Sequence, residues 1–390
     1  MTGALEVADI FRMYGPLYRK SHKLPVRYLR VMRAIEICRT HELGGHKYKC
    51  DTCGSFQINY NSCRNRHCPK CQNLDTERWL EARKKEIIPT HYFHAVFTLP
   101  ENLRALILRN QKVSYNILFR SVSETLKKVS GDPKHLGAEI GFVSVLHTWS
   151  QTLLDHPHIH CIIPGGGLSP DGKKWISCID NFFIPVNILS KVFKGKFLDY
   201  LKQANEKGEL KFVGQISAVK DKDNFKRMLN DLYDQNWHVY CKLPFKNPEK
   251  VIEYLGRYTH RVAISNDRIV KLEEDKVTIR YRDYSDDDKI KYMSLESFEF
   301  IRRFLLHVLP TQFFRIRYYG FLSARNRKTK LLRCKELLGS DAIETEEQIL
   351  SFQNLFEKVT GIDPTLCPRC KKGRLIFYET IYPVQGRSPP

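Results

Sequence analysis

Apolar and polar positions alternate in several short stretches of the chain, which is the pattern of half-buried β-strands. These stretches cover residues 92–99, 140–151, 155–164 and 239–243. Longer segments between them carry apolar side chains at helical spacing, at residues 101–130, 188–206 and 222–234. Strands and helices in this mixed order predict an α+β domain, in which helices flank a central antiparallel β-sheet.

The pattern differs before and after this domain. Residues 1–48 and 74–88 are helical in pattern. Residues 267–293 predict a β-meander, and a helix that ends at Pro310 follows it. We therefore predict three regions, with boundaries at residues 1–88, 89–293 and 294–390.

The stretch 155–164 has histidines at alternating positions, followed by an apolar, β-branched run. A strand there places His158 and His160 on one face, about 7 Å apart, where both imidazoles can bind one cation. Two histidines on one face of an apolar strand are costly unless something binds them. We therefore predict a metal site, with a hydrogen-bonded structural pair as the alternative.

The third ligand of this site has several candidates. On the preceding strand, odd-numbered positions share a face, so Gln151 or His147 can approach the pair. We favour Gln151 because it lies nearer the connection, and His156 is a further alternative. Two imidazoles, an amide and water suit a catalytic Mg²⁺ or Mn²⁺, although imidazoles also bind Zn²⁺ or Ni²⁺.

A helix is expected to begin at Asn247, because Asn is a good N-cap and Pro248 fits the first helical position. Tyr254 and Tyr258 are four residues apart and so project from one face of that helix. Aromatic packing is the simplest interpretation of the tyrosines alone. Beside a metal site, however, a tyrosine oxygen can attack a DNA phosphate and form a phosphotyrosine.

Cysteines occur in C-x-x-C pairs, which indicate zinc in a chain of this length. Two pairs lie close together and predict one zinc ribbon, with Cys63 and His67 as spare ligands or packing residues. The predicted zinc ligands are Cys50, Cys53, Cys68 and Cys71. A third pair near the end of the chain, Cys367 and Cys370, predicts half of a second zinc site. Cys334 is the nearest further thiol that could ligate there.

The charge balance favours a polyanionic partner. The chain has 64 Lys and Arg against 43 Asp and Glu, a net charge of +21, which suits nucleic acid better than a membrane surface. Compositional drift of a lysine-rich proteome is the alternative. The basic side chains near the motifs are predicted to contact DNA: Arg64, Arg66, Lys70, Lys242, Arg257, Arg261, Arg325, Arg327 and Lys328.

Neither a long apolar run nor a signal-peptide pattern is present, so we expect a cytoplasmic protein that associates with the nucleoid. No membrane partner is expected. A G-x-x-x-x-G-K-[ST] phosphate loop is also missing from the sequence, so the chain shows no helicase motor.

The motifs together resemble a known group of proteins. His158-Ile159-His160 resembles the histidine–hydrophobe–histidine motif of HUH endonucleases, and Tyr254-Leu255-Gly256-Arg257-Tyr258 resembles their two-tyrosine motif. With the cysteine-rich residues 61–71 and the stretch 156–168, nearly the whole chain resembles two-tyrosine rolling-circle transposases of bacterial insertion sequences, which carry an N-terminal zinc-binding domain.

The resemblance implies an HUH fold and transposition through single-stranded DNA with hairpin ends. One tyrosine would become linked to a 5′ phosphate and leave a free 3′ hydroxyl, and the second would hold or exchange another strand. Three other functions remain open from the sequence: an HUH replication initiator or relaxase, a non-catalytic zinc-dependent regulator, and a zinc hydrolase using His156, His158 and His160. The sequence does not determine the oligomeric state.

Overall fold

The computed structural model describes residues 5–179, 183–245, 250–251, 256, 263–284, 286–340 and 352–384. Its largest sheet has five strands, and every neighbouring pair is antiparallel. In spatial order these strands are β12 (Ile316–Tyr319), β4 (Phe142–Trp149), β5 (Asp155–Pro164), β3 (Tyr92–Thr98) and β8 (Val239–Phe245). The prediction of a central antiparallel sheet in an α+β chain is confirmed.

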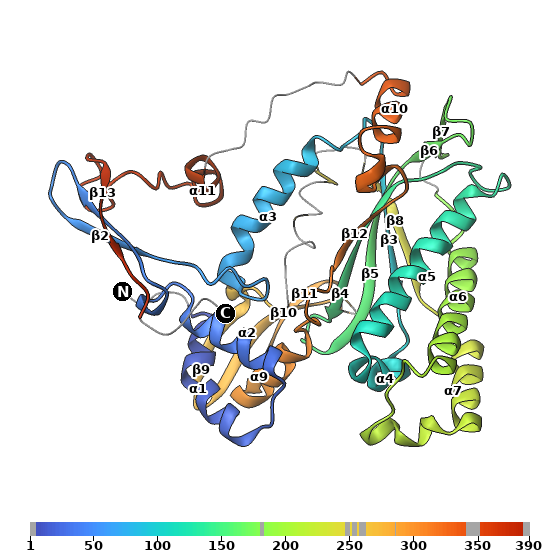
Figure 1. The fold of residues 1–390 in the computed structure, drawn as a ribbon, viewed down its shortest axis with the longest axis horizontal. Helices are drawn as coiled ribbons and strands as arrows, with labels where there is room; N and C mark the ends of the chain where they lie inside the picture. Colours follow the sequence, from blue (N-terminus) through green and yellow to red (C-terminus); the bar gives the residue numbers. More distant parts are fainter. Residues whose placement is uncertain are drawn as a thin grey trace.

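One face of this sheet is covered by helices (Figure 1). They are α4 (Arg104–Arg109), α5 (Gln111–Gly131), α6 (Val186–Glu206) and α7 (Lys222–Asp234). Odd-numbered residues of β5, such as Ile159 and Cys161, are fully buried in the core on this side. Phe97 of β3 meets Phe193 of α6 with ring centroids 5.2 Å apart. The apolar half of the strand alternation therefore packs here, and the even-numbered residues of β5 point to the other face.

The second face of the sheet carries the histidines. It is partly covered by α3 (Pro69–Lys84) and α10 (Lys330–Leu337), beside a small hairpin of β6 (Gly166–Leu168) and β7 (Trp175–Ser177). Leu80 of α3 and Leu331 of α10 belong to one buried cluster with Val145 of β4 and Ile162 of β5. This cluster fixes where α3 crosses the sheet.

The N-terminal helices α1 (Val7–Ser21) and α2 (Val26–Ile37) form a second core with α9 (Ser297–Leu306). Phe11 and Phe304 make an edge-to-face contact there, with ring centroids 5.2 Å apart. The same core includes a three-stranded antiparallel sheet of β9 (Ile269–Glu273), β10 (Lys276–Asp283) and β11 (Lys289–Glu296). The predicted β-meander is therefore confirmed.

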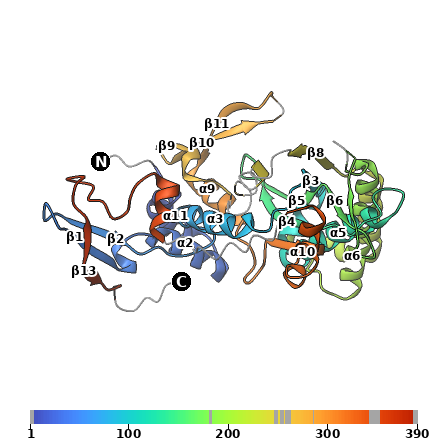
Figure 2. The same ribbon diagram turned by 90° about the horizontal axis from the view of Figure 1, so that it is seen from above.

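A third unit, the ribbon sheet, lies at the far left of the molecule in Figure 1 and again in Figure 2. Its strands are β13 (Leu375–Ile381), β1 (Gly45–Cys50) and β2 (Phe56–Tyr60), in that spatial order. Before β13, α11 (Phe352–Thr360) lies beside α3, where Lys358 forms an ion pair with Glu81. The two ends of the chain therefore meet in one sheet.

Two strands depart from the predicted boundaries. β12 lies at the edge of the central sheet, although we placed everything after residue 293 in a separate C-terminal region. β13 pairs with β1 near the N-terminus. Local periodicity reveals a strand but not its distant partner.

Most of the helix expected from Asn247 lies outside the described residues. None of the described helices combines the length and apolar character that a bilayer span needs.

Tyr318 of β12 accepts two hydrogen bonds from α3, from Trp79 Nε1 at 2.8 Å and from an Arg83 nitrogen at 3.1 Å. We expect Tyr318→Phe to lower the free energy of unfolding by about 1–3 kcal/mol, because both donors lose their acceptor. Urea unfolding measures this. Tyr382→Phe is the control: that side chain is 81% exposed, and its replacement should change stability by less than about 0.5 kcal/mol. Equal effects would show that Tyr318 does not hold α3 to the sheet.

Candidate active site and metal clusters

Three histidines meet on the second face of the central sheet. In the β4–β5 register His147 lies directly opposite His158, and Val145 lies opposite His160. The nearest ring nitrogens of His147, His158 and His160 all lie within 4.8 Å of one another. A small closure would bring them to the separation that a shared cation with metal–nitrogen bonds of about 2.0–2.1 Å requires. The metal site predicted at His158 and His160 thus acquires a third imidazole.

The protonation state of His158 suits metal binding. Its Nδ1–H donates to the carbonyl oxygen of His156 at 2.6 Å, which leaves the Nε2 lone pair for a ligand. Burial lowers the pKa of His158 to about 4, and burial also holds the pKa of His160 well below its ordinary value. Both rings are therefore neutral at physiological pH, and the neutral ring is the form that ligates.

A fourth histidine, His94 of the neighbouring strand β3, lies beside His160. Its Nε2 is 2.8 Å from Nδ1 of His160, and the two rings are stacked. If His160 ligates through Nε2, its Nδ1 carries the proton and donates it to Nε2 of His94. Burial lowers the pKa of His94 to about 3, so this ring is neutral and can accept. Sequence reasoning missed His94, although its even position in the 92–99 strand pattern could have indicated it.

The preferred third ligand, Gln151, is not where the metal ligands gather. β4 ends at Trp149, and the register shifts between His147 and Trp149. Gln151 lies in the following turn, where its amide nitrogen donates to the Tyr284 hydroxyl at 3.2 Å. The second candidate, His147, lies with His158 and His160 instead. His156 is exposed and contributes its backbone carbonyl, which orients His158.

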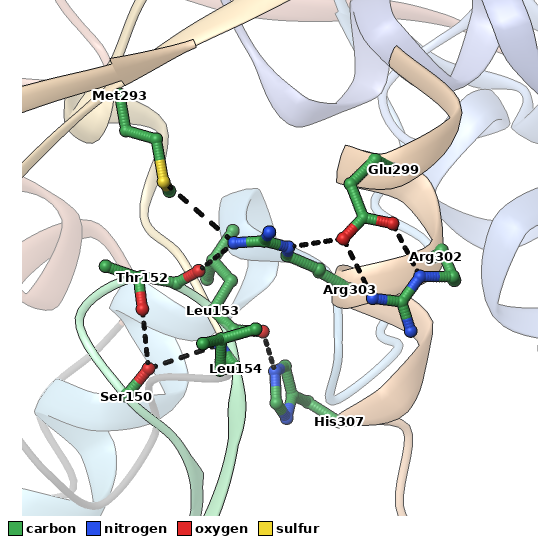
Figure 3. Close-up of polar contacts among 9 residues, drawn as sticks. All are labelled: Ser150, Thr152, Leu153, Leu154, Met293, Glu299, Arg302, Arg303 and His307. Atoms are coloured by element: carbon green, nitrogen blue, oxygen red, sulfur yellow. Dashed lines mark hydrogen bonds and ion pairs between the residues drawn. The ribbon is translucent and has the colours of Figure 1, made fainter. Parts of the chain in front are cut away.

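The turn between the two histidine strands is held by α9 and the residues that follow it (Figure 3). Arg303 donates to the carbonyl of Thr152 at 2.9 Å, and Nε2 of His307 donates to the carbonyl of Leu153 at 3.0 Å. Leu153 adopts φ +61° and is fully buried. A leucine in the left-handed region is unfavourable, so surrounding contacts must impose this turn. It sets the β4–β5 register and hence the His147–His158 pairing.

The two predicted nucleophiles, Tyr254 and Tyr258, lie outside the described residues. Their neighbours in the sequence are informative. Val251 is buried in the cluster that includes Leu80 and strands β4 and β5 on the histidine face. At Gly256, between the tyrosines, a Cβ would lie 2.8 Å from a Leu80 methyl group. Val251 and Gly256 therefore lie beside α3 on the side of the sheet where the histidines are.

One cysteine cluster joins α2 to the start of α3. It consists of Cys38, Cys63, Cys68 and Cys71. Cys71 Sγ lies 3.6 Å from the Sγ atoms of both Cys38 and Cys63. Zinc–sulfur bonds of about 2.3 Å place tetrahedral thiolates close to 3.8 Å apart, so the donor set and its spacing fit zinc. The cluster attaches the N-terminal helices to the helix that crosses the central sheet.

A second cysteine cluster joins the two ends of the chain. Cys50 Sγ lies 3.7 Å from Cys370 Sγ, and Cys53 Sγ lies 3.8 Å from Cys367 Sγ. A hydrogen bond from Ser55 helps to lower the pKa of Cys367 to about 6, which favours the thiolate that ligates metal. This cluster also has the geometry of a tetrahedral zinc site.

The predicted grouping of Cys50, Cys53, Cys68 and Cys71 is wrong, because the first two and the last two of these cysteines belong to different clusters. Cys334 is also wrong as a ligand: it lies on α10 and is fully buried in the apolar cluster that includes Leu331 and Leu80. Cys38 was missed because it stands alone in the sequence. The packing alternative holds for His67, which is buried and accepts a hydrogen bond from the Leu309 amide through Nε2.

Several predicted DNA contacts have other partners. Arg66 donates to the carbonyls of Pro310 and Phe313, Lys70 pairs with Glu6, and Arg327 pairs with Glu86. These three side chains hold elements together. Exposed side chains remain at Arg64, Lys242, Arg325 and Lys328, while Arg257 and Arg261 lie outside the described residues. Lys242 lies directly opposite His94 in the β3–β8 register and so shares the histidine face.

The two thiol clusters predict two zinc ions per chain. Cys367→Ser with Cys370→Ser should remove one ion and free β13 from β1, while Cys38→Ser with Cys63→Ser should remove the other. Zinc content measured by inductively coupled plasma mass spectrometry, after dialysis, decides this. Zinc content that is the same in the Cys367/Cys370 variant and the unaltered chain would instead favour a ribbon site within residues 50–71, without a contribution from the C-terminal pair.

His147→Ala should weaken Mn²⁺ binding by more than the roughly 10–100-fold typical of losing a partner behind a ligand. Gln151→Ala is the matched control, since its amide faces Tyr284, and should leave the affinity within about twofold. Titration calorimetry on both variants gives the comparison. The opposite ranking would restore Gln151 as the third ligand.

Comparisons with known proteins match this architecture. Residues 141–330 match a family described as "Putative transposase", and residues 10–99 match one described as "Transposase zinc-binding domain". The first match spans strands β4, β5, β8 and β12, and the second spans the cluster of Cys38, Cys63, Cys68 and Cys71. No solved structure matches the chain.

Two relatives extend the match over most of the chain. "Putative transposase y4qJ" of Sinorhizobium fredii is 50% identical over 388 residues, covering 99% of this chain and 97% of that protein. "Transposase for insertion sequence element IS801" of Pseudomonas savastanoi pv. phaseolicola is 27% identical over 348 residues, covering 88% and 82%. The chain therefore belongs to the IS91 family of bacterial insertion-sequence transposases, two-tyrosine proteins of the HUH type with an N-terminal zinc-binding domain.

Proposed function

We propose that this transposase cleaves and rejoins single-stranded DNA at the ends of its insertion sequence, with Tyr254 and Tyr258 as nucleophiles. The observation that carries the proposal is the position of the three histidines. His147, His158 and His160 gather on the sheet face whose apolar cluster includes Val251, and Gly256 lies beside Leu80 of that cluster. A phosphate held at this face would lie on the same side of the sheet as these two described neighbours of the tyrosines.

The reaction that we propose is a transesterification. The oxygen of one tyrosine attacks the scissile phosphorus, its phenolic proton leaves, and the bond from phosphorus to the 3′ oxygen breaks. The released oxygen takes up a proton and becomes a free 3′ hydroxyl, while the 5′ phosphate stays on the tyrosine. Because the phosphodiester energy is retained, attack by another 3′ hydroxyl rejoins the strands without ATP.

The histidine cluster would hold the divalent ion of this reaction, for which we propose Mg²⁺ or Mn²⁺. Such an ion, when bound, polarises a phosphate oxygen and stabilises the charge that develops during attack. The remaining roles fall to the protein. His94 and the carbonyl of His156 orient the ligating rings, and the exposed Lys242 on the same face can bind the DNA backbone.

The zinc clusters have a structural role in this proposal, because closed four-thiolate sites leave no position for a substrate. Hairpin ends of the element are the proposed DNA substrate, and host replication or helicase proteins the proposed source of single strands. The printed names of both relatives say transposase, which favours element ends over a plasmid origin.

The proposal predicts a covalent protein–DNA adduct. Labelled single-stranded element ends, incubated with Mg²⁺ or Mn²⁺ and then denatured, should migrate with the protein. Tyr254→Phe with Tyr258→Phe should abolish the adduct, a loss of at least about a thousandfold for removal of a nucleophile. Tyr240→Phe is the control for loss of an exposed hydroxyl on the histidine face and should retain the adduct. Cleavage without an adduct would indicate a hydrolase, and full activity of the double variant would rule out both tyrosines.

A further inference from the structure

One face of the ribbon sheet exposes apolar and aromatic side chains that no described segment covers. We call it the ribbon face, and define it by Phe56, Ile58, Tyr60, Ile376 and Tyr378. Phe56 is 50% exposed and Tyr378 is 54% exposed, which is unusual for aromatic side chains in the strands of a folded sheet. Such a surface marks an interaction site.

The register places these side chains together although they come from opposite ends of the chain. Phe56 of β2 lies opposite Lys49 of β1, and Lys49 lies opposite Ile376 of β13, so the three share a face. A bulge in β13 between the partners of Lys47 and Tyr48 brings Tyr378 to the same side, where its ring centroid lies 5.1 Å from that of Phe56. The aromatic pair therefore exists only when β13 is paired with β1.

Lysines are interleaved with the rings. Lys47 Nζ lies 4.5 Å from the Phe56 ring centroid and 5.3 Å from that of Tyr378, and Lys49 Nζ lies 5.9 Å from Phe56. Lys47 also forms an ion pair with Glu379, with 2.8 Å between Lys47 Nζ and a carboxylate oxygen of Glu379. Lys49 is exposed and has no carboxylate partner among the described residues.

Further basic side chains lie at one end of the ribbon sheet, near the cluster of Cys50, Cys53, Cys367 and Cys370, which we call the bridging cluster. Arg369, Lys371 and Lys372 are exposed and follow or flank Cys367 and Cys370. No carboxylate within the described ranges pairs with any of the three. The ribbon face and its surroundings therefore combine flat apolar rings with positive charge, and that combination fits one polyanion in particular. Single-stranded nucleic acid offers unpaired bases for stacking and phosphates for the cations.

We propose that the ribbon face binds single-stranded DNA by stacking bases on Phe56 and Tyr378, with Lys49 on the phosphates. The inference rests on the proposed function, since it assigns a binding surface to the same substrate. Small sheets that use aromatic side chains in this way stack two or three bases. A duplex, whose bases are already stacked, has only its phosphates to offer this face.

The proposal gives the bridging cluster a purpose. Tyr378 and Ile376 reach the ribbon face because Cys367 and Cys370 hold the C-terminal segment against Cys50 and Cys53. The ribbon sheet lies far from the histidine sheet in both views (Figures 1 and 2). Binding of the DNA strand and its cleavage thus occupy separate ends of the molecule, joined by α3.

The test uses the full zinc-loaded chain without added Mg²⁺ or Mn²⁺. Fluorescence anisotropy measures its affinity for a labelled oligothymidine and for a blunt duplex of equal length. We expect Phe56→Ala with Tyr378→Ala to weaken oligothymidine binding by about tenfold or more and to change duplex binding little. Tyr233→Ala is the matched control, because that ring is 60% exposed with Lys194 4.8 Å above it but lies on α7, and its affinity should be unchanged.

Three outcomes would overturn the proposal. Unchanged oligothymidine affinity of the Phe56/Tyr378 variant removes it directly, and equal losses on single strand and duplex leave only a phosphate contact. A change of oligomeric state with unchanged DNA affinity would make the face an interface between copies of the chain. Zinc content and circular dichroism, which should match the unaltered chain, establish that the variant is folded.

The adduct assay separates this proposal from the proposed reaction. If the unaltered chain forms no adduct but the Phe56/Tyr378 variant still loses oligothymidine binding, the tyrosine chemistry fails and the stacking surface stands. The other result would be that the unaltered chain and the Phe56/Tyr378 variant both form normal adduct with saturating DNA and bind oligothymidine equally well. In that case the tyrosine chemistry stands and the stacking surface fails.

Discussion

The pairing of β4 with β5 is the interaction on which the active site depends. Strand side chains alternate with a period of two, so a shift of one residue would send His147 to the helix-covered face. The tight turn at residues 150–154 prevents that shift, because Arg303 of α9 and His307 just after it donate hydrogen bonds to carbonyls of the turn. In addition, Leu153 is buried with an unfavourable φ. The geometry of the histidine cluster is thus determined by contacts from α9 and the residue after it, which contribute no histidine to the cluster.

Burial gives the histidine cluster its chemical character. Removing several imidazoles from water disfavours their charged forms, so they remain neutral at a pH where an exposed histidine would be partly protonated. A neutral imidazole keeps a ring-nitrogen lone pair that can bind a cation. Hydrogen bonds from the second layer, at His94 and at the carbonyl of His156, select which ring nitrogen faces inward.

The thiol clusters attach elements that share little apolar surface with the central sheet. The cluster of Cys38, Cys63, Cys68 and Cys71 ties the N-terminal helices to α3, and the bridging cluster closes the chain upon itself. Because α3 then crosses the histidine face, its position and that of Gly256 beside Leu80 depend on both the apolar cluster and the thiolates.

Much of this could be derived from the sequence by itself. Alternation identified β3, β4, β5 and β8, the spacing of His158 and His160 predicted a shared face, and C-x-x-C pairs indicated zinc. All of these are local signals, in which the residues that act together are neighbours along one element. The family followed from the same motifs, because the histidine and tyrosine motifs are short and specific.

Only the tertiary structure decided which distant residues meet. His147 rather than Gln151 faces the histidine pair, because the strand ends and bulges at Trp149 before Gln151 is reached. Cys50 and Cys53 meet Cys367 and Cys370 instead of Cys68 and Cys71, because β13 pairs with β1 across more than 300 residues of sequence. A thiol pair offers the same two ligands to any partner, so spacing indicates zinc but cannot choose between two half-sites. The choice is made by strand pairing, which no local pattern encodes.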